Sequence, residues 1–281
     1  MLNRVFGSLP YFRRRQRPAV AVVRLSGVIG GGSRGRLNIA ALARPIERAF
    51  RMRGVKAVAL DINSPGGSPV QSALVYRRVR QLAKEKKVPV FAFAQDVAAS
   101  GGYWIACAGD EIFADENSIM GSIGVISGGF GLGDFIGRFG IERRLHTSGD
   151  KKSFLDPFLP EKDDELDRLR ELQGDIHDSF KALVRERRAG KLKAGEDVLF
   201  SGEFWTGKRA LDLGLIDGLG DLRGTMRERF GEKVRFRVFG ADTSWFRRRM
   251  GLSEGGSLAP SWSDELLATL EARSLWNRFG L

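Results

Sequence analysis

Residues 55–109, "VKAVALDINSPGGSPVQSALVYRRVRQLAKEKKVPVFAFAQDVAASGGYWIACAG", decide the fold. The segment begins with a strand rich in Val, Ala and Leu, which ends at the glycine turn "SPGGSP". An amphipathic helix over 70–87 follows, then a second strand over 88–95 and the beginning of another helix. Strands that alternate with helices predict an α/β domain with largely parallel strand pairing.

The same alternation continues on both sides of this segment. Residues 19–30 read as a strand and 38–54 as a helix, and 111–118 read as a short strand and turn. Residues 161–190 carry Leu, Ile and Phe at spacings of three or four and predict a long amphipathic helix, and 234–240 alternate as a strand. The two turns at 64–68 and 99–102 both follow strands, which is where open α/β sheets place their sites.

The composition is that of a globular domain with an excess of positive charge. The chain has 281 residues, of which 42% are hydrophobic and 28% are charged. Its one cysteine, Cys107, excludes an intramolecular disulfide and reads as a small core residue. A formal net charge of +12 favours an anionic partner, which could be a membrane surface, an acidic protein or nucleic acid.

The composition also suggests three parts. Residues 1–18 form a basic N-terminal arm, 19–240 form the main domain, and 241–281 form a linker and a C-terminal amphipathic helix. The arm lacks the apolar core of a secretory signal, and no stretch approaches 18 uninterrupted apolar residues. We therefore expect a cytoplasmic protein or one peripheral to the inner membrane. Contact between the basic arm and an anionic membrane stays open as an alternative to a simple disordered arm.

Ser100, in the stretch "DVAASGGYWIA" (96–106), is the first candidate for chemistry. Small residues flank it on both sides, which suits either a helix N-cap or a nucleophile with space cleared for a substrate. A Ser–His–Asp arrangement would need His146 or His177, and His177 is better explained as a solvent-facing or half-buried side chain. The sequence has no zinc-type Cys/His spacing and no phosphate-binding loop.

A hydroxyl nucleophile with a lysine base remains. A lysine with the reference pKa of about 10.4 is charged at neutral pH, so the base must be buried away from water to accept a proton. Acyl transfer also needs backbone N–H donors for the oxyanion, which glycine turns supply. The turn "NSPGGSP" (63–69) is a candidate, although taken alone it is better explained as a simple turn into the next helix.

Four motifs in fixed order resemble the protease IV (signal peptide peptidase A) family of Ser–Lys serine peptidases. They are "DINSPGGSP" (61–69), "DVAASGGYWIACAGDEIFADENSIMGSIGV" (96–125), "TSGDKKSFLDPF" (147–158) and "FSGEFWTGKRALDLGLIDGLG" (200–220). The resemblance covers about residues 19–240. It implies the crotonase/Clp-protease-like fold, a spiral of β-β-α units in a single catalytic domain.

The resemblance also implies roles for five residues. Ser100 matches the nucleophile, Lys152 the general base and Ser122, in "MGSIGV", the serine that hydrogen-bonds the base. Gly67 matches an oxyanion-hole donor, and the backbone amide of Gly101 is a second one. The nucleophile and base are separated by 152 − 100 = 52 residues, which suits the single-domain members of the family.

The implied activity is a serine endopeptidase that cleaves apolar or unfolded peptides, such as signal-peptide remnants, through an acyl-enzyme. The implied assembly is a homo-oligomeric ring, with no metal, no cofactor and no specific nucleic acid. This chain departs from the family in lacking an evident membrane anchor and in carrying Asp156 near Lys152, which we expect to face away from the lysine. Two alternatives stay open. One is acyl-CoA hydratase, isomerase or thioesterase chemistry on the same fold, and the other is a non-catalytic, membrane-associated scaffold.

Overall fold

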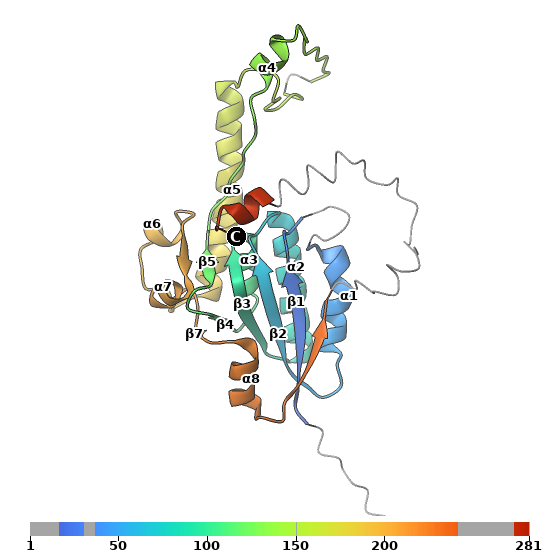
Figure 1. Cartoon of the computed structure of the whole chain (residues 1–281), viewed down its shortest axis with the longest axis vertical. Coiled ribbons are helices and arrows are strands. Elements are labelled where there is room, and N and C mark those ends of the chain that lie inside the picture. Colours follow the sequence, from blue (N-terminus) through green and yellow to red (C-terminus); the bar gives the residue numbers. More distant parts are fainter. Residues whose placement is uncertain (1–16, 31–36, 150, 241–272, 281) are drawn as a thin grey trace, which may run out of the picture.

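A computed structural model describes residues 17–30, 37–149, 151–240 and 273–280 (Figure 1). Its described part contains one eight-stranded sheet in the order β6-β5-β3-β2-β1-β8, with β4 paired to β3 and β7 paired to β4. All pairs are parallel except β5 with β6. The strands are β1 (Ala19–Ser26), β2 (Val55–Ser64), β3 (Val90–Ala99), β4 (Glu111–Ala114), β5 (Ile119–Gly121), β6 (Phe204–Thr206), β7 (Gly218–Leu219) and β8 (Arg235–Phe239).

Helices lie on both faces of the sheet. The helices are α1 (Ile39–Phe50), α2 (Pro69–Lys86), α3 (Gly101–Ala106), α4 (Gly133–Gly137), α5 (Asp163–Arg187), α6 (Glu196–Leu199), α7 (Gly207–Asp212) and α8 (Leu222–Phe230). The larger core packs α1, α2 and α3 on one face, and a smaller core around Phe93 and Met226 packs α8 on the other. Side chains alternate across each strand, so neighbouring residues of the buried strands supply both cores.

The predicted elements correspond closely to the observed ones. The helix predicted over 70–87 is α2, which begins with Pro69 at its first turn and Ser68 as its cap, and the strand predicted over 234–240 is β8. The helix predicted over 161–190 is α5. The proposed division at 18 and 240 stays a prediction, because residues 1–16 and 241–272 lie outside the described residues. Of the predicted C-terminal helix, residues 273–277 are described and are helical.

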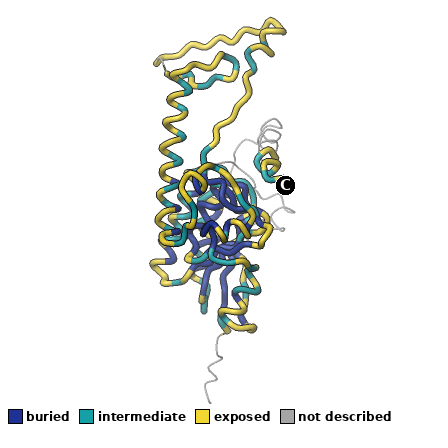
Figure 2. The backbone as a smooth tube through the Cα atoms, turned by 90° about the vertical axis from the view of Figure 1, so that its left-hand side faces the viewer, coloured by how far each residue is buried: buried dark blue, intermediate teal, exposed yellow. Residues whose placement is uncertain are grey.

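One segment projects away from the sheet. Residues 125–162, which we call the arm, leave the body after β5, form α4 at the far end and return into α5 (Figures 1 and 2). The N-terminal part of α5 is mostly exposed, and only Phe180 and Val184 of this helix are buried. Trp104 of α3 stacks on Phe180 with ring centroids 4.6 Å apart, so α5 packs on the body through its C-terminal half.

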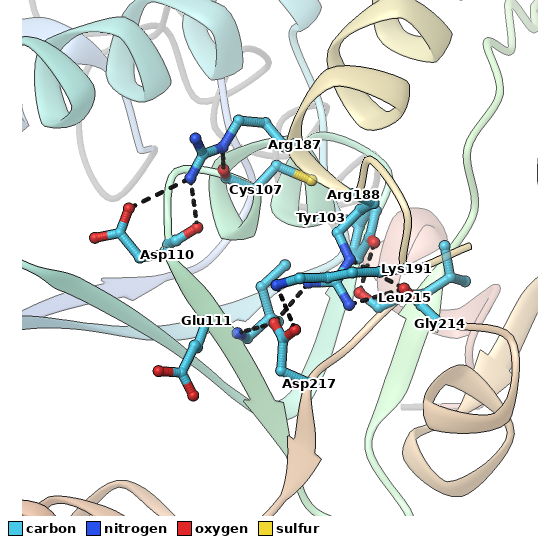
Figure 3. A network of polar contacts seen from close by, with 12 residues as sticks. Tyr103, Cys107, Asp110, Glu111, Arg187, Arg188, Lys191, Gly214, Leu215 and Asp217 are labelled. Atoms are coloured by element: carbon cyan, nitrogen blue, oxygen red, sulfur yellow. Dashed lines mark hydrogen bonds and ion pairs between the residues drawn. The ribbon is translucent and has the colours of Figure 1, made fainter. Parts of the chain in front are cut away.

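A buried polar network fixes that C-terminal half (Figure 3). Arg188, which is only 2% exposed, lies 2.5 Å from the Asp217 carboxylate and donates two hydrogen bonds to the Gly214 carbonyl. Lys191 donates to the other oxygen of Asp217 at 2.7 Å. Burial alone would raise the pKa of Asp217, but the hydrogen bonds from Arg188 and Lys191 lower it below its ordinary value. The network therefore joins the end of α5 to the chain that enters β7.

Candidate active site

Ser100 lies at the junction between β3 and α3. Its backbone has φ 50°, a region that non-glycine residues rarely adopt, and its N–H donates to the Gly121 carbonyl at 2.8 Å. It occupies the N-cap position of α3, yet its side chain makes no capping bond. Ser100 therefore occupies the N-cap position, as that interpretation expects, but its side chain does not cap the helix. The hydroxyl is left available, on a strained turn of the kind that presents nucleophiles.

Glycines keep the surroundings of Ser100 open. A Cβ on Gly66 would lie 2.8 Å from the Cβ of Ser100, and a Cβ on Gly102 would lie 2.6 Å from the Ser64 carbonyl oxygen. A side chain at either position would collide with the turn that carries the serine. Glycine is thus required at both positions by close backbone approach.

The backbones of two glycines, Gly67 and Gly101, lie close together beside this serine. Gly67 has φ +135°, and a Cβ on it would lie 2.0 Å from the Ile29 carbonyl oxygen. A Cβ on Gly101 would lie 3.4 Å from the Gly67 nitrogen, which brings the two glycines together. Within the described residues, neither the Gly67 N–H nor the Gly101 N–H donates to a protein acceptor. Paired, unused donors next to a hydroxyl are the geometry that stabilises an oxyanion.

Two buried serines that the sequence reasoning missed support the glycine turn. The Ser64 hydroxyl accepts from the Gly66 N–H at 3.2 Å, and the Ser72 hydroxyl donates to the Ser68 carbonyl at 2.9 Å. Both serines are fully buried. Ser64 belongs to the same "NSPGG" motif as Gly67, so the signal was present in the sequence. Only the contact reveals that its hydroxyl positions the turn.

Ser122 lies close to Ser100 because β5 pairs with the end of β3. Ala99 is opposite Gly121 in the parallel register, and Ser122 follows directly. Ser122 is buried, has φ 52° and donates its N–H to the Glu203 carbonyl at 2.7 Å. The structure therefore brings together four of the five predicted site residues: Ser100, Ser122, Gly67 and Gly101.

Lys152 is the predicted residue that the fold does not bring to Ser100. Its side chain is exposed, and its neighbour Lys151 lies 3.8 Å from Asp164 at the start of α5. Sixteen residues separate Asp164 from Phe180, which contacts α3, and this corresponds to about 24 Å along the helix axis. A lysine side chain cannot span that distance. Within one chain the arm therefore holds Lys152 away from the serine and in contact with water.

The structure gives the other residues singled out in the sequence exposed positions or contacts that do not involve Ser100. His146 is exposed, and His177 is half-buried with Nε2 3.1 Å from the Ile123 carbonyl oxygen, as expected of a non-catalytic histidine. Asp156 accepts from the Arg143 guanidinium and from the Phe158 N–H, so its carboxylate is engaged away from Lys152. Hydrogen bonds from Phe158 and Arg143 lower the pKa of Asp156. Cys107 is fully buried, as predicted.

The fold defines a class of protein, the α/β proteins of the crotonase/Clp-protease-like fold. Residues 82–232 match the family described as Peptidase family S49. The putative protease slr0021 of Synechocystis is 33% identical over 74% of this chain and 72% of its own length. Protease 4 of Haemophilus influenzae is 33% identical over 72% of this chain and 32% of its own length. The chain therefore belongs to peptidase family S49.

Two further comparisons extend this result. A protein of Brucella abortus named Na(+)/H(+) antiporter NhaA is 48% identical over 93% of this chain, which spans 37% of that protein's length. Among the described residues here, no helix has the length and apolar character needed to cross a membrane. A mutant of the 1510-N membrane-bound stomatin-specific protease, solved with a substrate peptide, shares the fold. It has a TM-score of 0.51 and 17% identity over 91% of this chain and 98% of the other.

The family and its protease-named relatives favour the peptidase interpretation over the acyl-CoA and scaffold alternatives.

Proposed function

We propose that the chain is a serine endopeptidase in which Ser100 is the nucleophile and Lys152 of a second copy is the general base. The observation that carries this proposal is the separation of the two halves of the site. Ser100 lies beside two unused N–H groups in the body, whereas Lys152 lies on an arm too far from Ser100 to act in the same chain. A homo-oligomer resolves the separation, because the arm of one copy can reach the serine of the next.

The chemistry then runs in balanced steps. The neutral Lys152 amine takes the Ser100 hydroxyl proton as the oxygen bonds to the peptide carbonyl carbon, and the N–H groups of Gly67 and Gly101 stabilise the oxyanion. The lysine returns that proton to the leaving amine, which leaves an ester on Ser100. A water then gives its proton to the lysine and attacks the ester, and the serine recovers its proton as the acid product leaves.

Burial at the interface supplies what a single copy lacks. Docking against a second copy would remove Lys152 from water, which is the condition under which a lysine amine loses its proton. Ser122, which is buried and directly follows β5, would orient the incoming amine by a hydrogen bond. The substrates proposed are apolar or unfolded peptides, including signal-peptide remnants, as the family resemblance implies.

The test is complementation between two inactive variants. Ser100→Ala and Lys152→Ala should each lose at least about a thousandfold in turnover of an apolar fluorogenic peptide. Mixed after dissociation and reassembly, they should recover about a quarter of the wild-type rate, because random neighbours pair an intact serine with an intact lysine in one site of four.

The matched control is Lys151→Ala, which removes the adjacent exposed lysine and should retain activity. If the mixture stays as inactive as its parts while oligomers form, the base does not come from a second copy. Full activity of either single variant would remove that residue from the mechanism.

A further inference from the structure

Ile29 lies between the two glycines whose N–H groups are the proposed oxyanion donors. It follows Ser26, the last residue of β1, and only 1% of it is exposed. A Cβ on Gly67 would lie 2.0 Å from the carbonyl oxygen of Ile29, and a Cβ on Gly101 would lie 3.3 Å from its Cδ1. The backbone of Ile29 therefore packs on one donor residue, and its side chain packs on the other.

The backbone of Ile29 holds the glycine turn by two hydrogen bonds. Its N–H donates to the Gly66 carbonyl at 2.8 Å, and its carbonyl accepts from the Ser68 N–H, also at 2.8 Å. These bonds make Ile29 the partner of Gly67 in a short parallel bridge. One residue thus fixes the peptide groups on both sides of Gly67.

The same bonds determine which way the Gly67 N–H points. The carbonyl of Gly66 and the N–H of Gly67 belong to one peptide group, and in a trans peptide these two bonds point in opposite directions. No described peptide bond is cis. Because the Ile29 N–H holds the Gly66 carbonyl, it directs the Gly67 N–H to the opposite side.

Only one N–H group of the turn remains free for a ligand. In the described part of the chain, the Gly66 N–H donates to the Ser64 hydroxyl and the Ser68 N–H donates to Ile29. The Gly67 N–H between them has no protein acceptor. The contact with Ile29 therefore both occupies a neighbouring donor and aims the free one.

The side chain of Ile29 bears on the distance between the two donors. Gly101 is the first residue of α3, and a Cβ on it would lie 3.4 Å from the Gly67 nitrogen, next to Cδ1 of Ile29. Close-packed interiors transmit the loss of even one methyl group to their neighbours. Removal of Cδ1 would leave a gap beside Gly101, into which the first turn of α3 could move.

Ile29 is itself held from its other side. The Gly30 N–H donates to the Leu37 carbonyl at 2.9 Å, and the Leu37 N–H donates to the Val28 carbonyl at 2.9 Å. Leu37 is buried, and both Ile29 and Leu37 belong to the larger core. A site that acts by preorganisation requires such support behind the groups that contact the substrate.

We propose that Ile29 is a positioning residue of the oxyanion hole, which sets the direction of the Gly67 N–H and its distance from the Gly101 N–H. Ile29 acts through the two glycines and contacts no reacting atom. The inference rests on the proposed function in one respect, that these two N–H groups bind the oxyanion. Ile29 lies outside the four motifs that carry the family resemblance, so only its contacts identify it.

Truncation of the Ile29 side chain tests the proposal. Ile29→Val removes Cδ1 alone and should lower the turnover number on an apolar fluorogenic peptide about tenfold. Ile29→Ala should lower it about a hundredfold. The Michaelis constant should stay within about twofold of wild type, because oxyanion donors act on the transition state more than on the bound substrate. Ile29→Leu keeps a δ-carbon and should retain activity within about threefold of wild type.

The matched control is the same pair of truncations at Ile46. Ile46 is fully buried in the same core and is not among the nearest neighbours of Gly67 or Gly101. Ile46→Val and Ile46→Ala should lower the urea midpoint about as much as the Ile29 variants but should retain the wild-type turnover number. Equal turnover numbers in the Ile29 and Ile46 variants would reduce Ile29 to core packing and overturn the proposal.

Inhibition by a peptide boronic acid gives a second readout. Such a compound bonds to a nucleophilic serine and places an oxygen where the oxyanion forms, so it depends on the same donors. Ile29→Val should weaken the inhibition about tenfold, in parallel with its turnover number, and Ile46→Val should leave it unchanged. An unchanged inhibition constant in Ile29→Val, with a lowered turnover number, would place the defect outside the oxyanion hole and reject the proposal.

Failure of this inference is distinguishable from failure of the proposed function. A low turnover number in Gly67→Ala combined with wild-type kinetics in Ile29→Val and Ile29→Ala would keep the oxyanion hole and reject the role of Ile29. Full activity of Ser100→Ala would reject the proposed function itself, whatever the Ile29 variants show.

Discussion

The arm and the nucleophile end of the body differ in almost every physical respect. Around Ser100, the surrounding chain is buried, and backbone hydrogen bonds and close glycine contacts fix each group. Around Lys152, the side chains are exposed and the apolar residues lack a covering layer in the described structure (Figure 2). One half of the proposed site is therefore preorganised within a single chain, and the other half depends on another surface to complete it.

This difference suggests how the activity could be controlled. Under the proposed function an isolated copy is inactive, because its Ser100 lacks the lysine that would accept the proton. The N–H groups of Gly67 and Gly101, the proposed oxyanion donors, are by contrast already close together within a single chain. Variants of the glycine turn beside Ser100 and variants of the contacts that hold the arm and α5 should therefore differ in which property they change and by how much.

The largest effect should come from the preorganised half. In Gly67→Ala, the added Cβ would lie 2.0 Å from the Ile29 carbonyl oxygen, and the residue has φ +135°. The turn must shift, which misplaces an oxyanion donor, and the turnover number should fall by about a hundredfold to a thousandfold. Steady-state kinetics on a fluorogenic peptide measures the loss. Gly128→Ala, on the arm where nothing lies within 4 Å of the added atom, is the control and should retain activity. Unchanged kinetics in Gly67→Ala would exclude the Gly67 N–H from the proposed oxyanion hole.

An intermediate effect should come from the anchor between α5 and the body. Asp217→Asn leaves Arg188, 2% exposed, without its carboxylate, and should lower the free energy of unfolding by about 3 kcal/mol. Asp167→Asn removes an exposed pair with Arg170 from the projecting part of α5 and should cost no more than about 0.5 kcal/mol. Urea denaturation gives both values. Equal costs would contradict the view that α5 is held only at its C-terminal end.

The contacts of Asp217 also imply that folding stability decreases at acidic pH. The pKa of Asp217 is lower in the folded protein than its ordinary value, so its stabilising effect is present above that value and is lost as pH falls below it.

The smallest effect should be the loss of folding stability at alkaline pH that the buried Cys107 thiol causes. Burial raises the pKa of Cys107 from 9.0 to about 12. Above pH 9.0 the unfolded chain loses this proton while the folded chain keeps it until about pH 12, so stability falls as pH rises through that window. Wild type should lose up to about 1.4 kcal/mol per pH unit more than Cys107→Ala. Urea midpoints between pH 8 and pH 10 would show it, and identical slopes would contradict burial of the thiol.

Much of the site could be predicted from the sequence because its signals are local. Glycines at 66, 67 and 101 are required by contacts of the backbone with itself, and such contacts leave fixed spacings along the chain. Ser122 is predicted from its motif, and the parallel pairing of β5 with β3 brings it close to Ser100. The hydroxyl of Ser64, which supports the turn, is not predicted from the sequence. No sequence feature distinguishes a buried serine whose hydroxyl positions a turn from one whose hydroxyl has no such role.

By itself, the sequence determined the alternation of strands and helices, the glycine turns and the identity of a serine suited to nucleophilic attack. These follow from hydrophobic periodicity and backbone sterics, which act over a few residues. Only the tertiary structure decided that the 52 residues of separation carry Lys152 outward to the far end of α5 instead of back to Ser100. The direction of that helix depends on packing at Phe180 and on the buried pair of Arg188 and Asp217, which are contacts between distant parts of the chain.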